Sequence, residues 1–189
     1  MATWERAGQL RRDMADIVGG LSEEQLQLAS LCEQWTVRGV TCHVTAFVTT
    51  SFPKFMWTVA KNRGNFDNAS LEMANTELAR PMGDVLADLR AKATKSSALP
   101  MFPEELTMTD TMIHMQDIRR PLGLGSGFDD ESMRTALDFL TEHKMATTLV
   151  DRKPLEGVKL SPSDLDWSWG DGAEISGSAE AIMMAMANR

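Results

Sequence analysis

Apolar residues recur at helical spacing through most of the chain. The first such segment ends at Gly19-Gly20, where a helix C-terminus is typical, so the pattern predicts a helix over residues 3–18. Ser22 can cap a short helical turn within residues 21–29, and residues 32–35 are interpreted as a loop.

The next apolar stripe begins after Thr36, which is placed to cap a helix N-terminus. The stripe covers residues 37–59 and contains Pro53, whose ring does not fit a straight helix, so one long helix kinked at the proline is predicted. A polar connection over residues 62–68 precedes a further helix over residues 70–80.

Three more helices are predicted before the pattern changes. The first covers residues 81–95 and is followed by a loop over residues 96–103 that contains two prolines. The second covers residues 104–120, with acidic residues in its first turn and basic residues in its last, as the helix macrodipole favours. The third covers residues 129–150 and is the final helix of the predicted bundle.

The last part of the chain has a different period. Apolar and polar residues alternate over residues 165–169, glycines on both sides of Asp171 supply a turn, and a second strand follows, which indicates a β-hairpin. Ser178 can cap a closing helix with one apolar stripe. The tail is therefore predicted as strand, strand, helix.

Together these elements predict a mainly α protein. We expect a helical bundle over residues 1–152 and a small hairpin-and-helix extension over residues 153–189. A chain of 189 residues can bury one principal core, and 43% hydrophobic and 24% charged residues are ordinary for a folded protein. No apolar run approaches the roughly 20 residues of a membrane span, and Glu5 and Arg6 interrupt any signal peptide. We therefore expect a cytoplasmic protein without a membrane partner.

Charge and cysteine usage narrow the range of partners. The net charge of -8 would repel a phosphate backbone, so we expect no nucleic-acid partner. Cys32 and Cys42 are too few for a disulfide framework or a four-thiolate zinc site, and both are interpreted as packed thiols in a reducing compartment. The sequence does not define the oligomeric state, and a homodimer is one possibility that it allows.

Histidine placement is the most informative chemical feature. Of the three histidines, His143 lies between charged residues and is interpreted as solvated, whereas His43 shares the inward stripe of its helix. Asp110, His114 and Asp117 follow the spacing of a single helix face. Because burying an uncompensated carboxylate is costly, Asp110 on an inward face requires a cation or strong donors. Two imidazoles and one carboxylate suit zinc and leave coordination positions open.

The same residues also allow a structural interpretation. His43 and His114 can be hydrogen-bonded core histidines, with Asp110 exposed or in a capping role. Asp117 can accept a hydrogen bond from an imidazole, or it can form an ion pair with Arg120. Spacing alone does not separate these alternatives.

Four segments carry a family resemblance. Residues 32–43 read Cys-Glu-Gln-Trp-Thr-Val-Arg-Gly-Val-Thr-Cys-His, and residues 110–123 contain Asp-Thr-Met-Ile-His and end in Arg-Arg-Pro-Leu-Gly. Residues 164–170 read Asp-Leu-Asp-Trp-Ser-Trp-Gly, and the closing segment begins with Gly-Ser-Ala-Glu-Ala-Ile at residues 177–182 and continues through Asn188-Arg189. In combination they resemble the mycothiol-dependent maleylpyruvate isomerase family of DinB-like metal-binding four-helix bundles, and the resemblance covers nearly the whole chain.

The resemblance implies a ligand set and a chemistry. The family's ligands, a histidine on the second helix and a carboxylate-x-x-x-histidine pair on a later one, correspond to His43, Asp110 and His114, with Asp110 standing where the family has glutamate. A metal-bound thiolate of mycothiol or a similar low-molecular-weight thiol would attack a small electrophilic substrate, giving transfer or isomerisation. Arg119 and Arg120 would bind carboxylates of thiol or substrate, or only complement the helix dipole. The alternatives are a non-catalytic metal- or ligand-binding bundle and a purely structural one.

Overall fold

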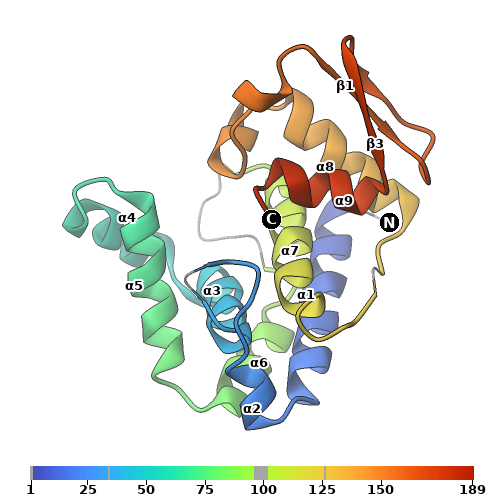
Figure 1. The fold of residues 1–189 in the computed structure, drawn as a ribbon. Helices are drawn as coiled ribbons and strands as arrows, with labels where there is room; N and C mark the ends of the chain where they lie inside the picture. The colour runs from blue at the N-terminus through green and yellow to red at the C-terminus, as the bar shows by residue number, and fades with distance from the viewer. Residues whose placement is uncertain (1, 34, 96–101, 126) are drawn as a thin grey trace.

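Four helices form the centre of the molecule. The computed structural model describes residues 2–33, 35–95, 102–125 and 127–189, so most of the loop predicted over 96–103 lies outside the described residues. The central helices are α1 (Thr3–Gly19), α3 (Val37–Thr49), α6 (Met82–Ala91) and α7 (Glu104–Arg119). Both α1 and α3 contact both α6 and α7, which closes the four helices into a bundle (Figure 1). The predicted mainly helical bundle is confirmed.

The remaining helices cover this bundle. They are α2 (Glu23–Leu26), α4 (Phe52–Lys61), α5 (Phe66–Leu78), α8 (Asp130–Glu142) and α9 (Ala179–Met186). Helix α5 packs on α3 and α4 packs on α5, so that α4 and α5 form an arm that projects from the bundle (Figure 1). Helix α8 packs on α7, outside the ring of four, and α9 packs on α8.

The single kinked helix predicted over residues 37–59 is wrong, because the chain forms two helices there. Helix α3 ends at Thr49, Thr50 and Ser51 are extended, and α4 begins with Pro53 in its first turn. Proline lacks an N–H, and within a helix its ring would clash with the carbonyl four residues earlier, which is that of Thr49. In the first turn of a new helix neither problem arises, so the proline starts α4 instead of bending α3.

The predicted start of α5 was four residues too late. Phe66, in the segment interpreted as a connection, is already helical. The side chain of Asn65 accepts a hydrogen bond from the backbone N–H of Asn68 at 2.8 Å and so caps the helix.

The predicted end of α8 at Val150 is also wrong. The helix ends at Glu142, because His143 adopts an extended conformation. Its Nδ1 accepts a hydrogen bond from the backbone N–H of Met145 at 3.1 Å and caps a short 3-10 helix over Lys144–Thr148. A second short 3-10 helix covers Lys153–Leu155.

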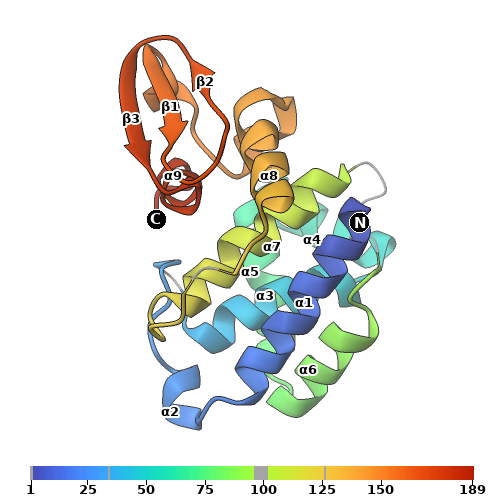
Figure 2. The same cartoon turned by 90° about the vertical axis from the view of Figure 1, so that its right-hand side faces the viewer.

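The tail contains a three-stranded sheet in place of the predicted hairpin. The central strand is β1 (Val158–Pro162), which pairs antiparallel with β2 (Trp169–Gly170) and parallel with β3 (Ala173–Gly177), as Figure 2 shows. The two predicted strands therefore pair with β1 and not with each other. A Cβ atom at Gly170 or Gly172 would overlap the backbone of residues 157–158, so these glycines permit the close approach of β1.

The tail and the bundle share one hydrophobic cluster. It includes Met108 and Leu137 from the bundle side and Leu160 and Met183 from the tail. Apolar side chains on both sides of the predicted boundary at residue 152 therefore contribute to a common core.

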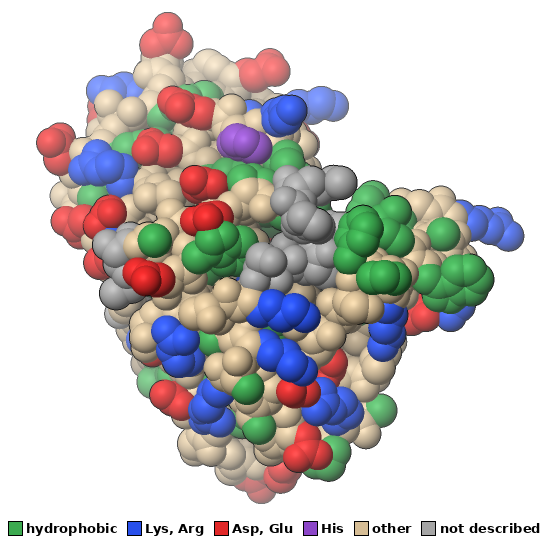
Figure 3. Space-filling view, turned by 180° about the vertical axis from the view of Figure 1, so that it is seen from behind, with side chains coloured by type: hydrophobic (Ala, Val, Ile, Leu, Met, Phe, Trp, Pro, Cys, Tyr) green, Lys and Arg blue, Asp and Glu red, His purple; other side chains and the backbone are tan. Residues whose placement is uncertain are grey.

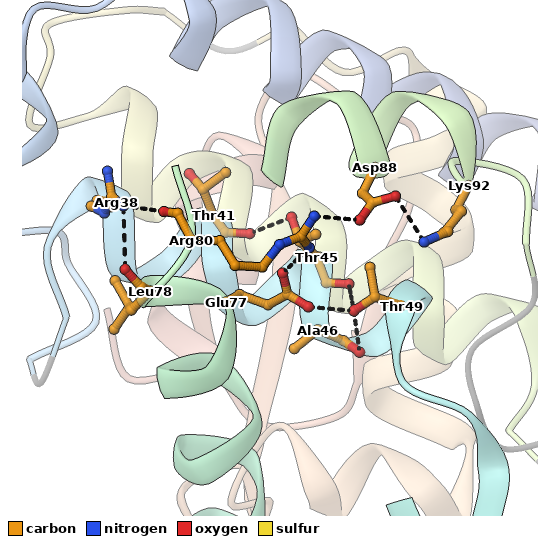
Figure 4. Close-up of polar contacts among 10 residues, drawn as sticks. All are labelled: Arg38, Thr41, Thr45, Ala46, Thr49, Glu77, Leu78, Arg80, Asp88 and Lys92. Atoms are coloured by element: carbon orange, nitrogen blue, oxygen red, sulfur yellow. Dashed lines mark hydrogen bonds and ion pairs between the residues drawn. The ribbon is translucent and has the colours of Figure 1, made fainter. Parts of the chain in front are cut away.

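A network of charged side chains fastens α5 to α3 and α6 (Figure 4). The buried Glu77 carboxylate accepts a hydrogen bond from Thr49 Oγ1 of α3 at 2.6 Å and pairs with Arg80 Nη1 at 2.6 Å. Arg80 also reaches Asp88 of α6 at 2.8 Å, and Asp88 pairs with Lys92. Because a buried carboxylate is stable only with its partners in place, the network sets the position of α5 against the bundle.

Candidate metal centre

Helices α3 and α7 bring His43, Asp110 and His114 together. Each residue offers one ligand atom, and these atoms all lie within 4.8 Å of one another. The two histidines are buried, whereas 29% of the Asp110 side chain remains exposed. The candidate site therefore lies in the interior and opens towards solvent beside Asp110.

The spacing of these side chains suits a small divalent ion. His114 Nε2 lies 3.5 Å from Asp110 Oδ1, and the two imidazole rings are 4.7 Å apart and nearly perpendicular. Two ligands bound at about 2.0–2.1 Å to a tetrahedral ion would be about 3.4 Å apart. Two imidazoles and one carboxylate are a donor set that could hold a divalent metal ion, and such sets occur in zinc sites that keep a position open for another ligand.

The orientation of His43 is set by side chains from three segments. Its Nδ1 lies 3.0 Å from the hydroxyl of Ser70 on α5, which leaves Nε2 as its available ligand atom. The indole of Trp35 lies 4.3 Å from the imidazole, and Phe47 contacts it edge-on at 5.0 Å between ring centres. The Trp35 ring is also 6.3 Å from that of His114, so one indole flanks both histidines.

The orientation of His114 is set by a carboxylate. Its Nδ1 lies 2.9 Å from Asp117 Oδ2, and the other oxygen of this fully buried carboxylate accepts a hydrogen bond from Arg189 Nε at 2.8 Å. Of the two roles predicted for Asp117, the structure therefore shows the contact with an imidazole. Arg120 pairs instead with Glu180 of α9 at 2.8 Å.

The two imidazoles have opposite electrostatic environments. Burial, with a smaller contribution from the charge of His114, holds the pKa of His43 well below its usual range. Burial would also lower the pKa of His114, but the carboxylates of Asp110 and Asp117 outweigh it and raise that pKa. Burial raises the pKa of Asp110 even though His114 and Arg11 oppose the shift. His43 thus favours the neutral form more strongly than a free imidazole does, while His114 favours the protonated form more strongly than a free imidazole does.

This asymmetry predicts that zinc binding displaces a proton from His114 when the pH is near or below the raised pKa of that residue. A ligating imidazole must be neutral, so affinity should fall as pH drops below the raised pKa of His114, by up to about tenfold per pH unit for one proton. Calorimetric zinc titrations in buffers of different ionisation enthalpy measure the proton release directly. The His143→Ala variant should release the same amount, and a binding heat independent of buffer would contradict the prediction.

Ser70→Ala should weaken zinc binding by about 10- to 100-fold, because partners that orient a ligating histidine typically contribute that much. Ser70→Thr keeps a hydroxyl and should retain most of the affinity. Competition against a chelating dye measures both constants. Equal affinity of Ser70→Ala and wild type would show that Ser70 does not orient His43.

The other residues considered from the sequence lie outside this group. His143 is half-buried, stacks on Phe139 and caps the 3-10 helix. Cys42 is fully buried, and burial raises the pKa of its thiol to about 11, which agrees with a packed thiol. Cys32 is only half-buried. The Arg119 guanidinium lies against the backbone of Gly127.

Sequence reasoning did not find four residues around the site. Ser70 and Arg189 come from segments far from the ligands in sequence, and no local pattern points to either. Trp35 lies in one of the segments that resemble the family, but its contact with two histidines depends on how a loop folds.

Arg11 is 2% exposed and donates to the carbonyls of Ala93 and Lys95, and burial lowers its pKa to about 10. Of these four residues, only Arg11 gave a signal in the sequence. It is a charged residue on the otherwise apolar stripe of the helix predicted over residues 3–18.

The fold and this group of side chains define a class, the DinB-like helical domains, with two inward histidines and a carboxylate that could hold a metal ion. The family model of the mycothiol maleylpyruvate isomerase N-terminal domain matches residues 7–119, and the chain belongs to this family. The matched segment includes His43, Asp110 and His114. No curated protein and no solved structure gives a match. Among the described helices, none has the length and apolar character to cross a membrane.

Proposed function

We propose that this protein is a zinc-dependent transferase or isomerase that uses mycothiol or a similar low-molecular-weight thiol. The observation that carries the proposal is the arrangement of the two imidazoles. Each has an oriented partner at Nδ1, so the Nε2 atoms remain as ligands beside a carboxylate, in an interior site with one exposed edge. Membership of a mycothiol-related family supports the choice of thiol. The cytoplasm, where such thiols stay reduced, is the proposed location.

His43, Asp110 and His114 would hold the ion, while Ser70 and Asp117 keep the imidazoles in their ligating orientation. A bound zinc ion would lower the pKa of a thiol and stabilise the thiolate near neutral pH. The exposed edge of Asp110 leaves a route for the thiol and its electrophile.

The substrate would be a small molecule with an electrophilic carbon. In transfer, a carbon–sulfur bond forms while the leaving group departs with its electron pair, and the thiol proton passes to solvent. In isomerisation, the thiolate adds to a conjugated double bond, rotation follows about the resulting single bond, and elimination returns the thiolate. Arg119 and Arg120 are the proposed partners for carboxylates of either reactant, and binding by Arg120 would displace Glu180.

The test is thiol transfer by the zinc-loaded protein to a fluorogenic alkyl chloride such as monochlorobimane. We expect a mycothiol-dependent rate above the uncatalysed one, and a fall of at least about 100-fold in His43→Ala, which loses a ligand to the ion. The matched control is His143→Ala, which removes the one histidine outside the site and should keep the wild-type rate.

Two outcomes would count against this proposal. Stoichiometric zinc without thiol-dependent turnover, across a panel of thiols and electrophiles, would favour the non-catalytic metal-binding bundle. An equal rate in wild type and His43→Ala would show that turnover does not depend on the proposed site.

A further inference from the structure

One segment of this acidic protein contains no acidic residue. Residues 34–66 include no Asp or Glu and carry four basic residues, Arg38, Lys54, Lys61 and Arg63, whereas all 27 acidic residues lie elsewhere. The segment thus has a formal charge of +4 within a chain of net charge -8. Lys61 pairs with Glu72 of α5 at 2.7 Å and Arg38 donates to carbonyls at the other end of α5, so Lys54 and Arg63 supply the basic charge of the segment near α4. Such charge asymmetry indicates a surface that meets an anionic partner.

Helix α4 lies within this segment and is apolar on its outward side as well as its inward side. Phe55 and Val59 face inward and are buried, whereas 41% of Phe52, 47% of Met56 and 72% of Trp57 is exposed. Soluble monomers seldom cluster large exposed apolar side chains in this way. A polar outer face would be expected if α4 met only water.

Phe66, at the start of α5, extends the same apolar surface. Its side chain is 60% exposed, and its ring lies 6.3 Å from that of Phe55, which packs beneath α4. We call the exposed side chains of Phe52, Met56, Trp57 and Phe66 the arm patch.

The arm patch sits on helices that project from the bundle. Figure 1 shows α4 and α5 extending away from the body. In the opposite view, hydrophobic side chains gather on this arm and Lys or Arg side chains mark its end (Figure 3). The arm can therefore meet an extended surface without interference from the acidic body.

We propose that the arm patch docks on the surface of an anionic lipid membrane, in contrast to the expectation of no membrane partner that was based on the lack of a spanning segment. Interfacial helices combine Trp and Phe, which enter the headgroup region, with Lys or Arg, which contact anionic lipids, and α4 combines both. The acidic remainder of the chain is repelled by the same lipids and orients the arm towards them.

Flotation of the purified full chain with lipid vesicles tests this proposal. We expect binding to phosphatidylcholine vesicles that contain phosphatidylglycerol, weaker binding to phosphatidylcholine alone, and loss of the difference at high salt. The Met56→Ser/Trp57→Ser variant should lower the partition coefficient at least about tenfold. Lys54→Gln should lower it about fivefold on the anionic vesicles only.

Ile175→Ser is the matched control, because Ile175 on β3 is 47% exposed, as is Met56, but lies on the tail. It should bind vesicles as wild type does, and unchanged circular dichroism would verify the fold of each variant. Absence of wild-type binding to anionic vesicles, or equal binding by the Met56→Ser/Trp57→Ser variant, would overturn the proposal. So would a dimer in sedimentation that this variant dissociates, since the arm patch would then be a contact between copies.

Discussion

The His114→Ala variant is expected to lose zinc, with an affinity lower by on the order of 1,000-fold or more. The substitution removes one of three protein ligands and leaves Asp110 and His43 on separate helices with no imidazole between them. Elemental analysis after dialysis should show about one zinc per wild-type chain and none in the variant. Zinc should raise the melting temperature of the wild type alone, because a ligand stabilises only the state that binds it.

The control for this experiment is again His143→Ala, which should keep both the zinc and the shift in melting temperature. A His114→Ala protein that retains one zinc per chain would contradict the assigned ligands. A wild type that melts at the same temperature with zinc and with a chelator would favour the structural interpretation, in which the two histidines are ordinary core residues.

The second large effect is expected at Asp117. Asp117→Asn keeps the shape of the side chain but removes the charge that pairs with Arg189 and stabilises protonated His114. Breaking a buried ion pair typically costs about 3–5 kcal/mol, and Arg189 keeps some contact with solvent, so we expect about 3 kcal/mol of lost stability in urea unfolding. Zinc affinity should fall by about 10- to 100-fold, because the imidazole loses its carboxylate partner.

Glu180→Gln is a suitable comparison for Asp117→Asn. It also removes a carboxylate paired with an arginine, but Arg120 is 38% exposed and Glu180 keeps 12% exposure, whereas Asp117 is fully buried. The change should alter stability by less than about 1 kcal/mol and leave zinc affinity unchanged. Similar losses in the two variants would indicate that Asp117 contributes only a general ionic contact.

Local pattern was sufficient to predict most helices, because each buries one face and ends at a residue that disfavours helix. It was insufficient where the outcome depends on competition between local structures. The sequence around Pro53 permits a bent helix or two helices, and the packing of Phe55 and Val59 against α5 favours two. Strand β1 was missed because its partners come from later in the chain, so strand pairing could not be inferred from one short segment.

The three proposed ligands could be predicted for a different reason. Burying a carboxylate costs free energy unless a cation or hydrogen-bond donors compensate it. Asp110 lies one helical turn before His114 on the predicted inward face, so the sequence itself indicates that a compensating partner is needed. The partners of the imidazoles gave no such signal. Ser70 contributes a common hydroxyl, and only the packing of α5 against α3 places it next to His43.

Helix α5 carries both Ser70, which contacts His43, and Glu77, which anchors the helix, two turns apart on one face. Any event that displaces α5 would therefore rotate or free one imidazole, even if it acts at the distant end of the arm. Because coupling between two sites is reciprocal, an ion held by His43 would in turn restrain the arm. Metal loading and arm mobility would then be thermodynamically coupled, with the contact between Ser70 and His43 as one link between them.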